Sequence, residues 1–406
     1  MANPNAQAKS TGSTESSPKI TPKIDTELAT YRSQYPILAE TTYMNSNSMG
    51  AMPARAREAI GSYFDRWQHE GVEAWGPWQS FINETADTVA RLLGGLPGHT
   101  TLNQNVAFFQ AQVASALDLS GPKNKVVSEA LMFPNVLYVW DGFCRQAGGE
   151  LHLVPSDDGI NVPTERILAA IDERTALVTV SHAIYVSGAL LDIHAICKRA
   201  HEVGALVMVD VYQTLGTVPI DVQSWDADIV VGGSHKWLCG GPGTCFMYVR
   251  PDIAPQLSPA ITGWMAHADP FAFAPAPIEL SDGPWRFMGG TPSVPAYYVA
   301  REAYRNLDEI TIPRIRAHNL ALSQTVIARA DEAGLTVHSP RSDDARAGFV
   351  AIEFPGSEAA SKTLIAEHYK HDWRPACGVR VGPHFYSTEA EVHRFMDRVV
   401  QLAKRE

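Results

Sequence analysis

Cysteine is scarce in this chain, and the placement of the few cysteines excludes several kinds of site. The 406 residues include five cysteines, at positions 144, 197, 239, 245 and 377, and none of them forms a C-x-x-C pair. An odd number of scattered cysteines argues against a disulfide framework, and the missing pairs argue against a zinc or redox site. We interpret all five as reduced thiols of a cytoplasmic protein, and we predict no metal site.

Long hydrophobic runs and an excess of positive charge are also missing. No stretch approaches the roughly 18 to 20 apolar residues of a membrane helix, and the N-terminus lacks the charged and then apolar pattern of a signal peptide. The chain has 33 Lys and Arg against 44 Asp and Glu, a formal net charge of −11. Because nucleic acids and anionic membranes bind clustered Lys and Arg, we expect neither as a partner and expect a small-molecule ligand instead.

Two nucleotide-binding motifs are missing as well. No GxGxxG follows a predicted strand, and GxxxxGK[ST] does not occur. These absences remove the main support for a dinucleotide-binding protein and for a P-loop protein.

Strands and helices alternate between residues 125 and 250. Short apolar runs predict strands at residues 125–128, 151–154, 175–180, 205–209 and 228–231. Amphipathic spacing predicts helices at residues 163–172 and 192–203, and before them at 54–68 and 81–93. This βαβ order predicts an α/β fold with a large doubly wound domain and a mainly parallel sheet.

The composition divides the chain into four predicted parts. Residues 1–24 contain almost nothing to bury and predict a disordered leader. Residues 25–53 form an N-terminal arm that we associate with the small domain, and residues 54–292 form the large domain. Helices and strands in another order after Pro292 predict a smaller C-terminal α+β domain at residues 293–406.

Two ionisable residues follow neighbouring apolar runs. Asp210 ends the run at 205–209, and Lys236 follows the run at 228–231 with glycines on both sides. Ligands of open α/β sheets bind beyond the carboxyl ends of the strands, so we expect both residues in one crevice. A buried carboxylate there pairs with a protonated ring nitrogen, and a desolvated lysine becomes a nucleophile that forms a Schiff base. Either residue alone is explained as well by a surface position, but together they indicate pyridoxal phosphate (PLP).

Longer motifs around these residues resemble a known group of enzymes. Asp210-Val-Tyr-Gln213, Val218-Pro-Ile-Asp221 and Ser234-His-Lys236-Trp-Leu-Cys-Gly-Gly-Pro-Gly243 resemble fold-type I PLP enzymes of the class V aminotransferase group. Within that group the chain is most similar to kynureninase. The matching segments, in the order of that family, are Tyr43-Met-Asn-Ser-Asn-Ser-Met-Gly50, Phe133-Pro134, His182-Ala-Ile-Tyr185, Gly263-Trp264-Met-Ala-His267 and Val379-Arg380-Val381.

The resemblance implies PLP as cofactor and a role for each matching residue. Lys236 is implied as the Schiff-base lysine, Asp210 as the partner of the pyridinium and Phe133 as the ring that stacks on the cofactor. The turn at Asn103 and Gln104 matches the phosphate-binding turn, where free N–H groups and the helix dipole receive a dianion, although ordinary helix capping explains it as well. The other cofactor-binding residues implied are Asn135, Tyr185, Gln213, Ser234 and His235.

Substrate binding is implied for a further group of residues. Arg380 matches the arginine that binds the substrate α-carboxylate, a planar anion that suits a guanidinium fork, and Arg374 is the alternative. Ser48, His267 and Trp264 are the other expected substrate contacts. Trp264 and Thr291 match positions that reach the phosphate of the neighbouring subunit, which implies a homodimer with composite active sites.

The implied activity is that of a PLP-dependent lyase or hydrolase acting on an α-amino acid at Cβ, with hydrolytic Cβ–Cγ cleavage as in kynureninase. The chain departs from the kynureninase pattern at Val136, Gln213 and His235. Asn135-Val136 and Asp210-x-x-Gln213 are more similar to cysteine desulfurases, and the segment after His235 is similar to isopenicillin N epimerase relatives. Cysteine desulfurase or C–S lyase, epimerase and aminotransferase therefore stay open as alternatives, whereas nothing in the sequence favours a non-enzymatic PLP sensor.

Overall fold

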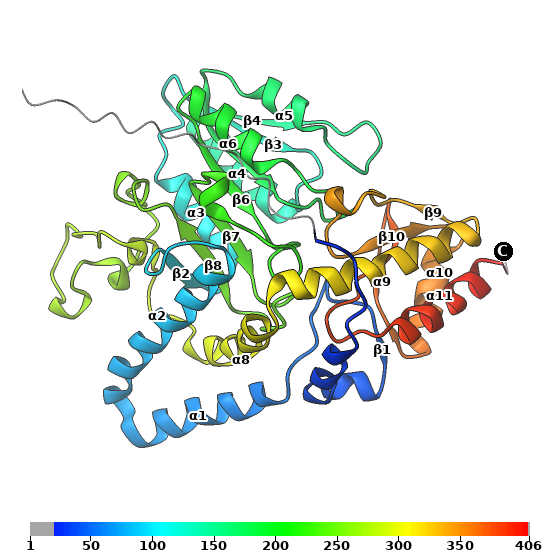
Figure 1. The fold of residues 1–406 in the computed structure, drawn as a ribbon. Helices are drawn as coiled ribbons and strands as arrows, with labels where there is room; N and C mark the ends of the chain where they lie inside the picture. Colours follow the sequence, from blue (N-terminus) through cyan, green and yellow to red (C-terminus); the bar gives the residue numbers. More distant parts are fainter. Residues whose placement is uncertain (1–19, 405–406) are drawn as a thin grey trace, which may run out of the picture.

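The computed structural model describes residues 20–404 of the chain (Figure 1). Most of the predicted leader, residues 1–19, lies outside the described residues. Within the described part, no helix is long and apolar enough to cross a membrane.

A seven-stranded sheet forms the centre of the molecule, in the order β2-β8-β7-β6-β5-β3-β4. Its strands are β2 (Thr100–Asn103), β3 (Lys125–Glu129), β4 (Glu150–Val154), β5 (Thr175–Ser181), β6 (Leu206–Asp210), β7 (Ile229–Gly233) and β8 (Cys245–Val249). β8 runs antiparallel to both of its neighbours, and the four pairs from β7 to β4 are parallel. The prediction of a mainly parallel sheet is thus confirmed, and each of the five predicted strands lies within a residue or two of an observed one.

Helices cover both faces of this sheet because side chains alternate along each strand. Met208 of β6 lies in one apolar cluster with Phe109 and Trp140, whereas its neighbours on the strand, Val207 and Val209, lie in another with Ile196. The first face is covered by α3 (Val106–Ser115) and α4 (Pro134–Ala147), and the second by α5 (Thr164–Ala170) and α6 (Ile193–Glu202). Burial on both faces explains why the parallel strands are continuous apolar runs in the sequence.

Long helices connect the sheet to the remaining parts of the chain. They are α1 (Arg55–Glu70), α2 (Trp75–Leu92), α8 (Val294–Ile310) and α9 (Ile312–Glu332), and a single turn of helix, α7 (Val222–Trp225), lies between β6 and β7. The predicted helices at 54–68 and 81–93 correspond to α1 and the second half of α2, which begins six residues before residue 81.

The C-terminal residues form a four-stranded antiparallel sheet to one side of the central sheet (Figure 1). Its order is β12-β13-β10-β9, with β9 (Thr336–Val337), β10 (Val350–Glu353), β12 (Asp372–Arg374) and β13 (Gly378–Val381), and it packs with α10 (Ser357–Ala366) and α11 (Glu389–Ala403). This arrangement confirms the expected smaller C-terminal α+β unit.

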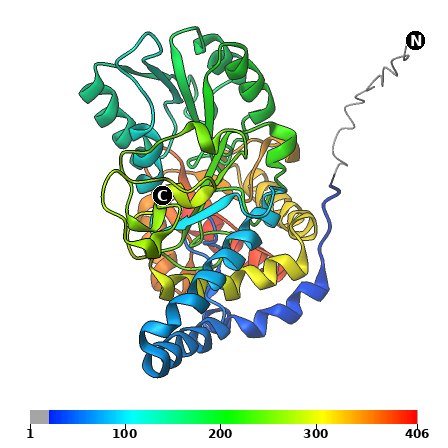
Figure 2. The same cartoon turned by 90° about the vertical axis from the view of Figure 1, so that its left-hand side faces the viewer.

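The N-terminal segment lies against this C-terminal unit. β1 (Thr42–Tyr43) pairs in parallel with β11 (Tyr369–Lys370), and the Lys23 amide donates to the Ala317 carbonyl of α9. Figure 2 shows the segment in dark blue beside the yellow helices. β1 lies in the predicted arm at residues 25–53, whereas Lys23 lies in the predicted leader. The association of the arm with the small domain and the domain boundaries at residues 54 and 293 stay predictions.

Candidate active site

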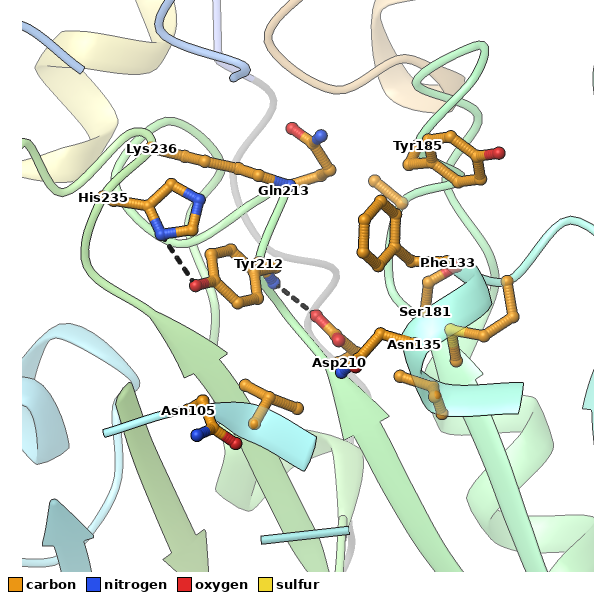
Figure 3. A pocket seen from close by; sticks show the side chains of 14 residues that line it. Asn105, Phe133, Asn135, Ser181, Tyr185, Asp210, Tyr212, Gln213, His235 and Lys236 are labelled. Carbon is orange, nitrogen blue, oxygen red and sulfur yellow. Dashed lines mark hydrogen bonds between the residues drawn. The ribbon is translucent and has the colours of Figure 1, made fainter. Parts of the chain in front are cut away.

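Asp210 and Lys236 lie at one edge of the central sheet and line the same cavity (Figure 3). β6 and β7 are parallel neighbours, with Asp210 opposite Val231, so the segments that follow them leave the sheet side by side. Lys236 comes three residues after β7 ends. The cavity has a volume of about 190 Å³, and it lies where open α/β sheets bind ligands.

The carboxylate of Asp210 is buried at the floor of this cavity. Its Oδ1 accepts a hydrogen bond of 2.8 Å from the Tyr212 amide. Burial raises the pKa of Asp210 to about 6, although the Tyr212 amide and the Lys236 charge favour the ionised form. A carboxylate that is costly to bury alone is stabilised by a cationic partner, which is what a protonated ring nitrogen supplies.

A second buried carboxyl group lies close to Asp210. Glu129, at the end of β3, accepts hydrogen bonds on Oε1 from the amide and the hydroxyl of Ser181, and Ser181 itself lines the cavity. Burial is the main cause that raises the pKa of Glu129 to about 7, and the Asp210 charge adds to it. Neither Glu129 nor Ser181 was predicted. Ser181 could have been found, because it directly follows the predicted strand at 175–180 and ligands of open α/β sheets bind beyond the carboxyl ends of the strands.

Lys236 is half-buried beside two aromatic rings. Its Nζ lies 4.6 Å from the centre of the Tyr212 ring and 5.7 Å from that of Phe133. Burial, and after it the charge of Arg380, lowers the pKa of Lys236 to about 8. A lysine amine with this pKa is available as a neutral nucleophile near neutral pH.

Phe133 and Tyr185 form the opposite wall of the cavity. Their rings meet edge to face, with centres 5.3 Å apart. Phe133 directly precedes Pro134, the first residue of α4, and about half of its side chain is exposed. Asn135, from the first turn of α4, lines the same wall. An exposed phenyl face next to Lys236 and Asp210 provides the surface on which a planar aromatic cofactor stacks.

Asn105, rather than Asn103 or Gln104, reaches this cavity at the start of α3. Asn105 caps the helix, accepting a hydrogen bond of 2.9 Å from the Phe108 amide. Asn103 and Gln104 line a second pocket of about 150 Å³, together with Thr291. The N-terminus of a helix attracts an anion through its free N–H groups and dipole. Asn105 directly follows the predicted turn at Asn103 and Gln104, and its helix-capping position is the sequence signal that identifies it.

Gln213 and His235 line the cavity, but Ser234 does not. Gln213 donates to the Asn47 carbonyl over 3.0 Å and accepts from the Trp237 indole over 3.2 Å. His235 pairs through Nδ1 with the Tyr212 hydroxyl at 2.9 Å. The Ser234 hydroxyl is buried against the Tyr304 hydroxyl, so its side chain is turned away from the space in which we expect the cofactor.

Arg380 is held by a carboxylate that the sequence did not indicate. It lies on β13, buried, and its Nε and Nη2 both donate to Asp372, with an Nε–Oδ1 distance of 2.9 Å. Its Nη1 donates to the Tyr185 carbonyl. Asp372 also pairs with Arg374 at 3.0 Å, so two guanidinium groups share one carboxylate and the group keeps a net positive charge. Nη1 and Nη2 each carry a second hydrogen beyond the one donated to Tyr185 or Asp372.

Eight residues expected at the site do not line the cavity of their own chain: Asn103, Gln104, Ser234 and Arg380, described above, and Ser48, Trp264, His267 and Thr291. Ser48 lies in the turn after Asn45. Trp264 packs on the rings of Trp75, Phe271 and Phe273, and the His267 imidazole accepts from the Asp269 amide. Thr291 lines the second pocket with Asn103. The roles implied for Trp264 and Thr291 concern the neighbouring subunit and stay predictions.

A comparison with known protein families identifies the family to which this chain belongs. The sequence model of the family Aminotransferase class-V matches residues 83–395, a range that includes the whole cavity. The chain belongs to the class V aminotransferase family. This chain is 31% identical over 374 residues to the uncharacterized aminotransferase YcbU of Bacillus subtilis. The aligned region covers 91% of this chain and 96% of that protein. This chain is also 28% identical over 384 residues to a kynureninase of Pseudomonas fluorescens, covering 90% of each.

Solved structures show the same fold at lower identity. A cysteine desulfurase from Thermococcus onnurineus superposes with a TM-score of 0.84 and 22% identity, covering 93% of the class V chain and 98% of the other. A variant of the protein C-DES with glycine covalently linked to its PLP cofactor superposes with a TM-score of 0.83 and 20% identity, covering 91% and 98%. They confirm the predicted fold class.

The cofactor of this class V enzyme is pyridoxal 5'-phosphate, and the residues present fit it. Asp210 is a buried carboxylate that accepts a hydrogen bond from the Tyr212 amide. Lys236 is a half-buried amine of lowered pKa, and Phe133 exposes a ring face beside both. Asn105 places a helix N-terminus at the same cavity. Among residues 20–404, no group of His, Cys, Asp and Glu is arranged to hold a metal ion.

Proposed function

We propose that this class V enzyme is a PLP-dependent lyase that acts on an α-amino acid at Cβ, by hydrolytic Cβ–Cγ cleavage as in kynureninase. The observation that carries the proposal is the buried guanidinium of Arg380, which lies close enough to Lys236 that its charge is, after burial, the next largest cause that lowers the pKa of that lysine. An amino acid bound through its carboxylate to Arg380 would have its Cα near the lysine. Kynureninases are also among the relatives that match about nine tenths of the chain.

Five residues have tasks in this proposal. Arg380 binds the substrate α-carboxylate through its remaining hydrogens and thereby orients Cα. Lys236 takes the α-proton and returns it, which requires an amine whose pKa lies near the operating pH. Asp210 keeps the ring nitrogen protonated, and the bound cofactor then supplies an electron sink for the bonds at Cα and Cβ. Phe133 and Tyr185 shield the reacting face from water.

The buried cysteines favour this reaction over a desulfurase that uses a cysteine nucleophile. Cys377 lies three residues before Arg380, but its side chain is buried and its thiol faces the Arg374 carbonyl. Burial raises the pKa of Cys377 to about 11, so the thiolate that attacks sulfur is disfavoured. The other four cysteines are buried as well.

A C–S lyase that needs no cysteine nucleophile is the second candidate. It is favoured by Gln213 and Val136, which line the cavity and depart from the kynureninase pattern, and by the fold shared with a cysteine desulfurase. Epimerase and aminotransferase activities use the same lysine and carboxylate. The substrate, rather than the cofactor, therefore distinguishes the candidates.

The proposal includes a cytoplasmic homodimer with composite sites. Trp264 packs with Phe271 and Phe273, whose side chains are 44% and 74% exposed. Exposed aromatic clusters of this kind are typical of protein interfaces. A second subunit that covers them would bring Trp264, His267 and Thr291 towards a cavity that they do not line within their own chain. The five free cysteines fit a reducing compartment.

A substrate panel tests the proposed reaction. The holoenzyme is incubated separately with kynurenine, 3-hydroxykynurenine, cysteine, cystine, and alanine with a keto acid, and a Lys236→Ala variant serves as the inactive control. Formation of alanine with anthranilate or its 3-hydroxy derivative supports the proposal. No turnover of either kynurenine, together with sulfide or persulfide from cysteine or cystine, would replace it with the C–S lyase.

A further inference from the structure

We propose that Glu129 is a second counter-ion of the cofactor site, which keeps its proton in the cofactor-free protein and releases it to solvent when Asp210 pairs with a cationic ring. The inference rests on PLP as the cofactor and not on the proposed reaction. Glu129 lies outside the motifs that resemble other PLP enzymes, and the proposed reaction does not use it.

The central sheet brings Glu129 to the edge at which we expect the cofactor. β3, β5 and β6 are consecutive neighbours in the sheet, and they end at Glu129, Ser181 and Asp210. Ser181 is opposite Asp210 in the register of β5 and β6, and both line the cavity (Figure 3). Because Glu129 accepts hydrogen bonds from Ser181, its carboxyl group lies directly behind the wall of the cavity.

The two oxygens of the Glu129 carboxyl group have different surroundings. Oε1 accepts hydrogen bonds from the Ser181 amide, over 2.9 Å, and from the Ser181 hydroxyl. Oε2 is buried and has no hydrogen-bond partner among residues 20–404. An ionised carboxylate carries charge on both oxygens, and a charged oxygen without a partner is costly to bury. The geometry therefore favours a neutral acid with its proton on Oε2.

The charges near Glu129 favour the same protonation state. Burial is the largest cause that raises the pKa of Glu129 to about 7, and the charge of Asp210 adds to it. Two neighbouring carboxyl groups do not both ionise readily. Asp210 is the better placed of the two, because the Tyr212 amide and the Lys236 charge stabilise its ionised form. His182, just beyond the end of β5, is neutral near pH 7, since burial lowers its pKa to about 3.

This balance shifts when Asp210 pairs with a protonated ring nitrogen. The negative charge of Asp210 is then offset, which removes one of the causes that raise the pKa of Glu129. Since that pKa lies near 7 in the protein without cofactor, a modest decrease ionises Glu129 in part at neutral pH, and the proton leaves to solvent. By linkage, a ligand whose binding releases a proton binds more tightly as the pH rises.

Glu129→Gln tests the inference in the full-length protein freed of cofactor, because glutamine keeps the shape and the acceptor oxygen but cannot ionise. When PLP binds at pH 7, the parent should release a fraction of one proton more than the variant, while protons exchanged by PLP and Lys236 are common to both. We expect PLP affinities within about twofold at pH 6, and about threefold to tenfold tighter binding by the parent at pH 8.5, since one unit of pKa corresponds to a factor of ten. Glu173→Gln, at an exposed glutamate just before β5, is the matched control and should behave as the parent.

Infrared spectra of the parent, with carbon-13 in its glutamate carboxyl groups, measure the protonated acid directly and separate it from aspartate. We expect the carbonyl band of a protonated glutamic acid at pH 6 and its decrease when PLP binds at pH 7. Absence of this band at pH 6 would overturn the inference. So would a parent that binds PLP more tightly than Glu129→Gln by the same factor at pH 6 and 8.5, or equal affinities at both. Because no amino-acid substrate is used, a wrong reaction in the proposed function leaves these readouts unchanged.

Discussion

Replacing Asp372 with asparagine tests the arrangement that holds Arg380, the arginine for which we propose substrate binding. Only 10% of the Asp372 side chain and 3% of the Arg380 side chain are exposed. Asparagine has nearly the same shape as aspartate but carries no charge and has a single acceptor oxygen. The variant therefore leaves Arg380 and Arg374 facing each other without the carboxylate between them.

The expected loss of stability follows from this burial. Removing one partner of a buried ion pair costs about 3 to 5 kcal/mol, because the other charge stays buried without compensation. Since the asparagine oxygen still accepts one hydrogen bond and Arg374 is partly exposed, we expect a decrease of about 3 kcal/mol in the free energy of unfolding. With Arg380 less firmly held, we also expect KM for the amino acid to rise more than kcat falls.

The effect should depend on pH in one direction. Burial by itself raises the pKa of Asp372, but the charge and hydrogen bonds of Arg380 outweigh it, with a contribution from Arg374, and the net pKa is lowered. A carboxylate with a lowered folded pKa stabilises the fold above the pKa of an unfolded aspartate, about 3.9, and loses this contribution as the pH falls through the folded pKa. The difference between parent and variant should therefore disappear only in acid.

Denaturant unfolding of parent and variant measures the effect, and Asp331→Asn is the control. Asp331 pairs with Arg341 at 2.6 Å, but both side chains are about half exposed, and exposed pairs contribute little to stability. We expect almost no change from Asp331→Asn. An equally small change from Asp372→Asn, with an unaltered KM, would refute the reasoning that the pair positions Arg380.

Two further predictions concern Lys236 and Cys377. Burial and the Arg380 charge lower the pKa of Lys236 to about 8, so the rate at which the apoenzyme attaches PLP should rise with pH through about 8 and then level off. Stopped-flow absorbance measures this rate. A rate that still rises near the ordinary lysine pKa of about 10.4 would contradict the prediction. Cys377→Ser should keep steady-state turnover of the substrate found in the panel within about twofold of the parent, because the buried thiol is protonated and unreactive. A large loss of turnover in a normally folded Cys377→Ser variant would instead indicate a reacting thiol.

Much of the central sheet could be predicted from the sequence because its information is local. Each parallel strand is a short apolar run, and burial on both faces of the sheet makes that run continuous. β2, β12 and β13 were not predicted, since strands of three or four residues are too short to show a period. β2 in addition pairs with β8, more than 140 residues further along the chain. The C-terminal unit was expected, but the strands that hold Asp372 and Arg380 were not.

The sequence by itself determined the cofactor site, because Asp210 and Lys236 follow neighbouring strands and the carboxyl ends of parallel strands meet at one edge of the sheet. Only the tertiary structure decided which side chains meet them there. Asp372 binds Arg380 across two antiparallel strands, and Tyr212 reaches His235 over a glycine on the next strand. Such contacts depend on strand register and on the direction of each side chain, which are set by packing between distant segments and leave no pattern in the local sequence.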